Sequence, residues 1–341
     1  MKKIERIAIM GAGSMGTLLG ARLAARGLNV HMADISRALV DAINQHGLTV
    51  HGTVELQVPA TASTPENMEG QFDLIVVLLK QTGNVAAIPQ IREHLAPEGI
   101  VLTLQNGIPE PGFVRAFGPD RVMGCAVTWG ATLQKPGVTL ATTGLENWHN
   151  SLGRIDGKTT DQVLAVRDIL EYMAPTQVTE NLIGIRWSKL LVNSALSGMS
   201  AALGCTFGEA AENPEALRCA QYIARECILV SQACGVRLEP LAEGEDFARM
   251  MLFRDETDRG STEWIFRKLF LATARGKASM LMDIERGVPT EIDFLNGYVC
   301  REAETVGIEV PYCSTVVKIV KSVEQGKMTA SVSNLPLFPK A

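Results

Sequence analysis

The first half of the chain alternates short apolar runs with stretches of helical period. The apolar runs cover 6–10, 29–34, 73–80 and 100–107. Runs of this length, bounded by turn residues, predict strands that are buried on both faces. The stretches between them, such as 15–27 and 36–47, have the spacing of amphipathic helices. Strands that alternate with helices predict a parallel sheet joined by right-handed crossovers.

Residues 121–155 carry further strand patterns, which are punctuated by glycines. They predict antiparallel strands that extend the sheet, and one of these covers 137–144. A helix is expected over 159–175, followed by a last short strand over 176–180. These elements complete the expected α/β domain.

From about residue 182 the strand patterns stop and helical periods dominate. Helices are expected over 184–203, 214–235, 240–254, 262–283, 290–306 and the stretch that begins at Cys313. A chain of 341 residues is also too long for one compact core. We therefore expect a first domain over 1–182 and an all-helical second domain over 183–341.

The glycines after the first apolar run have the G-x-G-x-x-G spacing. In a strand–turn–helix context this spacing predicts a Rossmann domain, because the turn brings backbone close to a pyrophosphate at a helix N-terminus. Gly11 would allow the tight turn, Gly13 the approach of the pyrophosphate, and Gly16 close helix–strand packing. The expected cofactor-binding residues here are Gly11, Gly13, Ser14, Met15 and Gly16.

Three polar residues stand at the carboxyl ends of predicted strands, where open α/β sheets bind ligands. Asp34 ends the second strand, and an acidic residue there would bond the ribose hydroxyls and repel a 2′-phosphate. This position favours NADH over NADPH, and the alternative reading is that Asp34 only starts the next turn. Lys80 and Asn106 follow the next two strands. A solvated lysine and an Asn-Gly turn are the alternative readings of these two positions.

The apolar helix that begins the second half carries one polar face. Lys189, Asn193 and Ser197 follow each other at four-residue intervals, so they share a side of the helix. A lysine is almost never buried without a partner. Spacing alone leaves two interpretations of Lys189 open, a salt bridge between helices and a functional group in a site.

Candidate partners lie in the segment 277–297. Ser279 and Asp283 are one helical turn apart. Thr290 and Asp293 have the spacing of a helix cap, which would start the helix at 290. Glu291 would then lie in the first turn, where a negative charge suits the helix dipole.

Charge and cysteine content narrow the function. The formal net charge of −5 gives no reason to expect nucleic acid as a partner. The seven cysteines include no C-x-x-C pair and predict neither a zinc site nor a disulfide framework. Reduced thiols are typical of a cytoplasmic protein, and no apolar run approaches the length that spans a membrane. We expect no metal.

With these motifs in order over most of its length, the chain resembles the ketopantoate reductase family (2-dehydropantoate 2-reductases). The residues that carry the resemblance are "GAGSMG", Lys80, "QNG", "WSKLLVN" and "ASMLMDIERGVPTEIDFLNG". It implies a Rossmann domain followed by a helical domain of the 6-phosphogluconate dehydrogenase-like C-terminal type. The implied reaction is hydride transfer from NAD(P)H to the ketone of a 2-oxo acid, in pantothenate biosynthesis. The resemblance further implies that the helical domain over 183–341 carries substrate binding and dimerisation, so that the protein is a homodimer.

The resemblance also implies a role for each candidate residue. Lys189 would be the general acid that protonates the developing alkoxide, and Glu291 would orient the polar groups around it and approach the cofactor. Lys80 would also approach the cofactor. The implied substrate-binding residues are Asn193, Ser197, Ser279 and Asn106, and Asn106 would also contact the nicotinamide.

The chain departs from the family pattern at three places. Ile35 stands where family members commonly have an arginine for the 2′-phosphate of NADPH, and Ser197 and Gly276 replace two asparagines. These departures favour NADH and leave the substrate open between ketopantoate, a related branched acid and a different 2-oxo or hydroxy acid. An opine-type dehydrogenase and a non-catalytic nucleotide-binding protein of the same fold are further alternatives.

Overall fold

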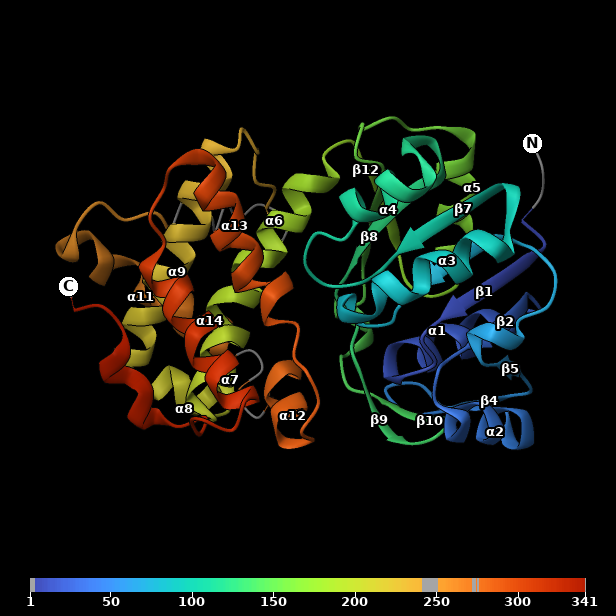
Figure 1. Ribbon diagram of the computed structural model, residues 1–341, viewed down its shortest axis with the longest axis horizontal. Helices are drawn as coiled ribbons and strands as arrows, with labels where there is room; N and C mark the ends of the chain where they lie inside the picture. Colours follow the sequence, from blue (N-terminus) through green and yellow to red (C-terminus); the bar gives the residue numbers. More distant parts are fainter. Residues whose placement is uncertain (1–3, 241–250, 272–273, 275, 341) are drawn as a thin grey trace. The chain divides into compact units, whose positions relative to one another are not determined.

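A computed structural model of the protein describes residues 4–240, 251–271, 274 and 276–340 (Figure 1). The chain divides into two compact units, Met1–Leu182 and Ile183–Ala341. The division falls where the hydrophobic pattern of the sequence changes from mixed to helical. No described helix is long and apolar enough to cross a membrane.

The first unit is built on an eight-stranded sheet. Its order is β12 (Thr176–Thr179), β11 (Asn150–Gly153), β8 (Val122–Val127), β7 (Leu95–Thr103), β6 (Phe72–Val77), β1 (Arg6–Met10), β2 (Asn29–Ala33) and β5 (Thr61–Ser63). Neighbouring strands run parallel except β8 and β11. The carboxyl ends of β1, β2, β6 and β7 therefore share one edge of the sheet, where ligands bind in such folds.

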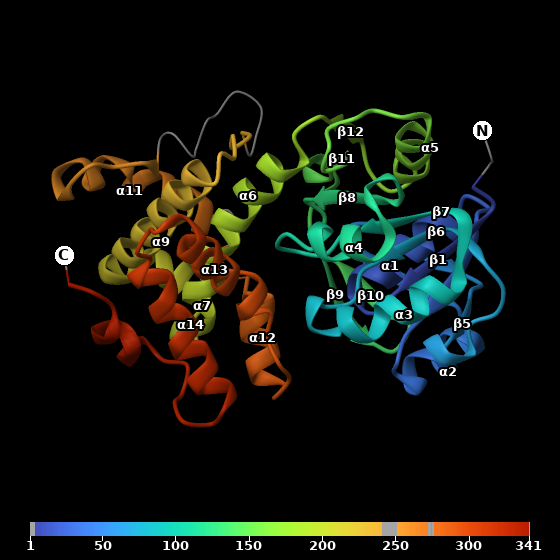
Figure 2. The same ribbon diagram turned by 45° about the horizontal axis from the view of Figure 1, so that its top comes forward.

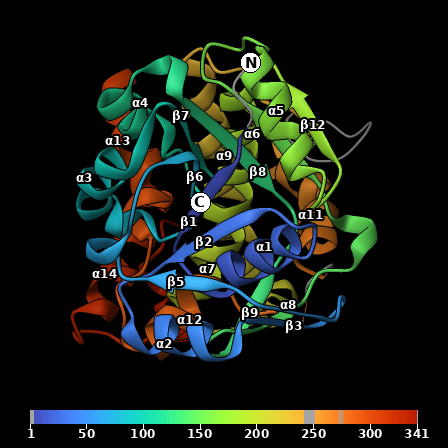
Figure 3. The same ribbon diagram turned by 90° about the vertical axis from the view of Figure 1, so that its right-hand side faces the viewer.

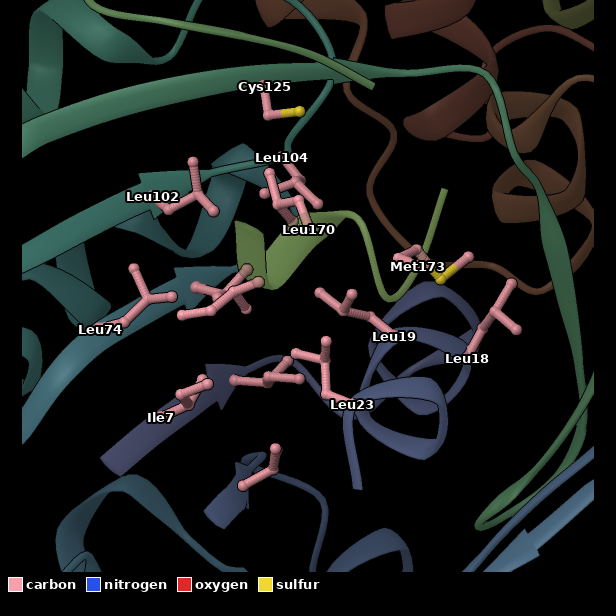
Figure 4. Close-up of a cluster of buried hydrophobic side chains, with 14 of the residues drawn as sticks. Ile7, Leu18, Leu19, Leu23, Leu74, Leu102, Leu104, Cys125, Leu170 and Met173 are labelled. Atoms are coloured by element: carbon pink, nitrogen blue, oxygen red, sulfur yellow. The ribbon is translucent and has the colours of Figure 1, made fainter. Parts of the chain in front are cut away.

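Helices cover both faces of this sheet, with α1 (Ser14–Ala24) and α5 (Asp161–Leu170) on one side (Figure 3). The other face carries α3 (Asn84–His94) and α4 (Glu110–Phe117). In β1, Ile7 and Ile9 point into the α1 layer, whereas Ala8 and Met10 point into the α3 layer. This alternation explains the continuous apolar run, because both faces of the strand are buried. Figure 4 shows leucines of α1 against the strand residues.

A second, four-stranded sheet has the order β4 (Leu56–Val58), β3 (Leu48–Gly52), β10 (Val138–Ala141) and β9 (Ala131–Lys135). The expectation that 137–144 extends the main sheet was wrong, because β10 pairs with β3. The edge of β8 is taken instead by β11. The small sheet packs against α1. Apolar side chains of α1 therefore lie in one buried cluster with residues of both sheets.

The second unit is helical over its described residues. It contains α6 (Leu182–Val192), the π-helix η5 (Asn193–Ser197), α7 (Gly198–Leu203), α8 (Phe207–Glu212), α9 (Pro214–Ala233), α11 (Glu256–Leu271), α12 (Ser279–Glu285), η6 (Ile292–Phe294), α13 (Asn296–Val306), α14 (Pro311–Glu324) and η7 (Val332–Leu337). Helices α9, α13 and α14 pack on one another (Figure 2). The seven cysteines all lie within the described residues and form no disulfide, and five are buried.

Several predicted helices differ from the observed ones. The helix expected over 262–283 is two helices, because the described residues 276–278 are not helical. The helix expected to start at 290 starts at 296, since Thr290 bonds Glu324 and Asp293 pairs with Lys321 instead of forming a cap. Most of the helix expected over 240–254 lies outside the described residues.

Candidate functional site

The glycine-rich loop lies between β1 and α1. Gly11 has a φ of 104°, in the region that favours glycine. A Cβ at Gly11 would come within 2.6 Å of the Leu79 backbone nitrogen, so this glycine also admits the loop after β6. A Cβ at Gly16 would lie 1.9 Å from the Gly11 carbonyl oxygen. Both residues are thus required by the packing of the chain itself.

Gly13 is different, because a Cβ built there would meet nothing within 4 Å. It precedes α1, and no side chain caps that helix end. The half-buried residues Gly13, Ser14 and Met15 therefore form the open rim of the loop, while Gly16 is buried. Open space at the uncapped N-terminus of a helix fits a phosphate group, whose charge the first-turn N–H groups would meet. The loop thus fits a dinucleotide.

Asp34 follows β2 and is tied to this loop. One carboxylate oxygen accepts the Ala12 N–H at 2.8 Å, and the other accepts the Ser36 N–H at 2.9 Å. The carboxylate is half-buried, and these two bonds fix its direction. The next residue, Ile35, is 84% exposed. The end of β2 therefore presents a negative charge and an exposed apolar side chain.

Lys80 and Asn106 lie in the loops after β6 and β7, three residues beyond the end of each strand. Both are half-buried. The first loop is held to β1, because the Leu78 and Leu79 N–H groups donate to the Met10 carbonyl oxygen. The second loop turns at Gly107, whose φ is 73°.

Two buried glutamines, which sequence reasoning missed as site residues, join these loops. The Gln105 amide donates to the Leu79 carbonyl oxygen and to Asn84 Oδ1, each at 2.7 Å. The Gln81 amide donates to the Asn106 carbonyl oxygen at 2.6 Å. Gln105 is the first residue of the "QNG" motif, whereas the sequence signal of Gln81 was only its proximity to Lys80. These bonds fix the backbone that carries both candidate residues.

In the second unit, Lys189, Asn193 and Ser197 are half-buried within a segment that is otherwise largely buried. Lys189 lies in the last turn of α6, Asn193 begins the π-helix η5 and Ser197 ends it. The predicted polar face therefore exists, but its helix is not regular. The π turn was missed, because no residue in this stretch breaks a helix.

Ser279 and Glu291 lie at opposite ends of the segment formed by α12 and the connection from α12 to η6. Ser279 is exposed as the first residue of α12, which packs against η5 and α7. Its neighbour Ala278 donates its N–H to Ser200 Oγ of α7 at 3.5 Å. Glu291 is half-buried, next to the Thr290 that bonds Glu324. The structure thus places Ser279 beside the helix that carries Asn193 and Ser197.

Arg186, one turn before Lys189, is a charged residue that the sequence did not single out. It is only 1% exposed. Nearby, Ser188 Oγ donates to the Glu239 carbonyl oxygen at 2.6 Å, which ties α6 to the segment after α9. Among the described residues, no group of three acidic, histidine or cysteine side chains could hold a metal ion.

Comparison with protein families gives two matches, one in each unit. The model described as "Ketopantoate reductase PanE/ApbA" matches residues 7–152, and its "C terminal" counterpart matches 181–324. A 2-dehydropantoate 2-reductase of Pyrococcus abyssi is 31% identical, over 90% of this chain and 93% of the relative. The same enzyme of Archaeoglobus fulgidus is 29% identical, over 95% and 99%.

Solved structures of the same fold cover nearly the whole chain. A PanE/ApbA family ketopantoate reductase from Ralstonia eutropha is 25% identical with a TM-score of 0.79, over 94% of this chain and 99% of that one. D-mandelate dehydrogenase, solved with NADH and anilino(oxo)acetate, is 22% identical with a TM-score of 0.80 over the same shares. At 22% identity, the second likeness concerns the fold alone.

Proposed function

This chain belongs to the ketopantoate reductase family of oxidoreductases, and we propose that it reduces a 2-oxo acid to a 2-hydroxy acid with NADH. The substrate is ketopantoate or a related branched 2-oxo acid. The observation that carries this proposal is the half-buried face of Lys189, Asn193 and Ser197 on a largely buried segment. A half-buried polar face of this kind can bind a polar ligand, and a 2-oxo acid supplies both a carbonyl and a carboxylate.

The first unit would hold the cofactor. Its pyrophosphate would lie at Gly13 and the first turn of α1, where the backbone is open and uncapped. Lys80 and Asn106 would approach the cofactor from the loops that Gln81 and Gln105 hold in place. When bound, the reduced nicotinamide supplies a hydride to the carbonyl carbon of the substrate.

The second unit would supply the proton and bind the acid. Hydride addition leaves a negative charge on the former carbonyl oxygen, and the Lys189 ammonium would stabilise this charge and donate the proton. Asn193, Ser197 and Asn106 would hydrogen-bond the substrate, and Ser279 would bind its carboxylate. Glu291 would orient the polar groups around Lys189 and approach the cofactor, so it acts as a positioning residue.

The preference for NADH rests on Asp34. Its carboxylate is held at the end of β2 by two backbone N–H groups. It could accept hydrogen bonds from ribose hydroxyls, whereas it would repel a 2′-phosphate. Arg37, exposed at the start of α2 (Arg37–His46), is the cation that NADPH binding would use instead.

A panel of 2-oxo acids, each measured with NADH and with NADPH, tests this proposal. We expect the highest kcat/KM for a branched 2-oxo acid with NADH. The replacement Asp34→Ser should move the NADPH/NADH ratio of kcat/KM towards NADPH by about tenfold or more, or about 1.4 kcal/mol. The exposed Asp41→Ser in α2 is the control for net charge.

Three results would change the assignment. Efficient turnover with NADPH alone, lost in Arg37→Ala, would reassign the cofactor. Turnover of other 2-oxo acids but not of ketopantoate or its branched relatives would move the chain to a different dehydrogenase activity. Cofactor binding without turnover of any acid would favour a non-catalytic nucleotide-binding protein.

A further inference from the structure

The π-helix η5 between α6 and α7 changes the hydrogen bonding of its own backbone. In an uninterrupted α-helix the Ser194 carbonyl oxygen would accept the N–H of residue 198. Here the Gly198 N–H donates to the Asn193 carbonyl oxygen instead, five residues back. A π turn contains one more residue than an α turn, so one carbonyl loses its helical donor. We assign this carbonyl to Ser194, because its oxygen does not receive the Gly198 N–H and accepts a side-chain donor from Asn296.

Asn296, the first residue of α13, supplies the missing donor. Its Nδ2 donates to the Ser194 carbonyl oxygen at 3.2 Å, and its side chain is completely buried. A Cβ on Gly198 would lie 2.8 Å from Asn296 Oδ1, so the amide contacts the end of the π turn as well. A residue 102 positions away in the sequence therefore completes the helix.

Two polar atoms close to this hydrogen bond lower the stability of the fold. Among the described residues, Ser194 Oγ and Asn296 Oδ1 are buried side-chain atoms without a hydrogen-bond partner. An unsatisfied buried polar atom costs about 1–3 kcal/mol. An apolar residue at 296 would avoid part of this cost, so the asparagine is not explained by stability alone.

We propose that Asn296 is a positioning residue that holds the π turn and thereby sets the direction of Lys189. One residue corresponds to about 100° of helix rotation. If the π turn relaxed to an α turn, α6 and α7 would rotate against each other by about that angle. All six residues of α7 are buried. In α6 four of the eleven residues are only half-buried, so the rotation would fall mainly on α6, which carries Lys189.

The proposal rests on the proposed function for its effect on turnover, but not for its effect on the helix. Two variants remove the bond in different ways. Asn296→Leu removes the donor, and Gly198→Ala pushes the amide away. Gly260→Ala is the matched control, because a Cβ at this exposed position in α11 meets nothing within 4 Å.

We expect kcat for the 2-oxo acid to fall about 10–100-fold in both variants, with little change in the KM for the nicotinamide cofactor. The double variant should lose no more than Asn296→Leu alone, because both changes break the same bond. A crystal structure of Asn296→Leu should show the Gly198 N–H bonded to the Ser194 carbonyl oxygen. Gly260→Ala should match the wild type in all of these measurements.

Asn296→Asp keeps the shape of the side chain and tests the donor itself. A protonated carboxyl can donate to the Ser194 carbonyl oxygen, whereas a carboxylate cannot. Its kcat should therefore fall with rising pH through an ionisation that the wild type lacks.

A π turn that persists in Asn296→Leu overturns the proposal, as does a relaxed turn with unchanged kcat. Equal pH profiles of Asn296→Asp and the wild type would also overturn it. If the wild type reduces no 2-oxo acid, the proposed function fails by itself, and the crystal structure still decides whether Asn296 holds the turn.

Discussion

The two units position their candidate residues in different ways. In the first unit the glycine-rich loop, Asp34, Lys80 and Asn106 all follow parallel strands of one sheet. Short-range turns and hydrogen bonds to neighbouring loops fix the positions of these residues. An example is the hydrogen bond that the Asp34 carboxylate accepts from the Ala12 N–H. In the second unit Lys189 and Asn193 lie where a helix changes its own hydrogen bonding, and a residue from α13 completes it.

This difference shows which kind of site can be predicted from local sequence patterns and which kind cannot. A site at strand ends inherits its geometry from sheet topology and glycine turns, and both leave local patterns in the sequence. A site on a helix bundle depends on the phase of each helix, and contacts from distant segments set that phase. Changes in the first unit should therefore act mainly on cofactor binding and folding, and changes in the second mainly on turnover.

The largest expected effect tests the second unit. Lys189→Ala should lower kcat by about 10²–10⁴-fold, because it removes the proposed proton donor and its charge. The Kd for the cofactor should stay near that of the wild type, since the proposed cofactor residues belong to the first unit. Single-turnover kinetics and cofactor titration would measure both quantities.

Lys318→Ala, at an exposed position of α14, is the matched control for the loss of a lysine. Turnover that survives in Lys189→Ala would show that another group supplies the proton. A parallel loss of cofactor affinity would break the division of labour between the units.

The glycine-rich loop gives the next effect, within a single motif. Gly16→Ala would force a Cβ against the Gly11 carbonyl oxygen and should destabilise the protein by about 3 kcal/mol. Gly13→Ala has open space and should unfold like the wild type, but with cofactor affinity lowered about tenfold. Urea unfolding and cofactor titration separate the two. Equal behaviour of the two variants would contradict their different roles.

Gln105→Leu tests the loops after β6 and β7. It would leave the Leu79 carbonyl oxygen and Asn84 without their donor. The free energy of unfolding should fall by about 2 kcal/mol. Cofactor affinity should fall with it, because these loops carry Lys80 and Asn106. The exposed Gln177→Leu on β12 is the control. An unchanged cofactor Kd would limit Gln105 to folding.

The smallest effects concern pH, and the two units should respond in opposite directions. In the second unit, burial raises the pKa of Glu226 to about 7, although the Tyr312 and Cys313 N–H groups partly offset this. In the unfolded chain the pKa of Glu226 is about 4.5, so above this pH the unfolded state loses the Glu226 proton while the folded state keeps it. Stability should therefore fall by about 2 kcal/mol as pH rises from 5 to 7.

In the first unit, the hydrogen bond from Arg154 lowers the pKa of Asp156 to about 2. This carboxylate stabilises the fold above about pH 4, and the contribution, about 1 kcal/mol, is lost as pH falls towards 2. Hydrogen exchange resolved by unit would measure both trends. Glu226→Gln and Asp156→Asn should each flatten one trend, and Glu212→Gln, exposed on α8, should flatten neither.

Much of the first unit could be predicted from local patterns. The apolar runs at 6–10 and 29–34 form β1 and β2. A strand that is buried on both faces has apolar residues along its whole length, so such a run indicates it directly. The strand at 138–141 was assigned to the wrong sheet, because strand propensity does not determine which other strand it pairs with. The pairing of β10 with β3 was decided by long-range contacts.

By itself, the sequence determined the α/β and helical halves, the glycine-rich loop, the acidic end of β2 and the four-residue spacing of Lys189, Asn193 and Ser197. Backbone geometry and helical period dictate these features locally. Only the tertiary structure decided that the polar helix contains a π turn, that Asn296 completes it, and that Gln81 and Gln105 join the two loops. Each depends on hydrogen bonds between segments that only folding brings together.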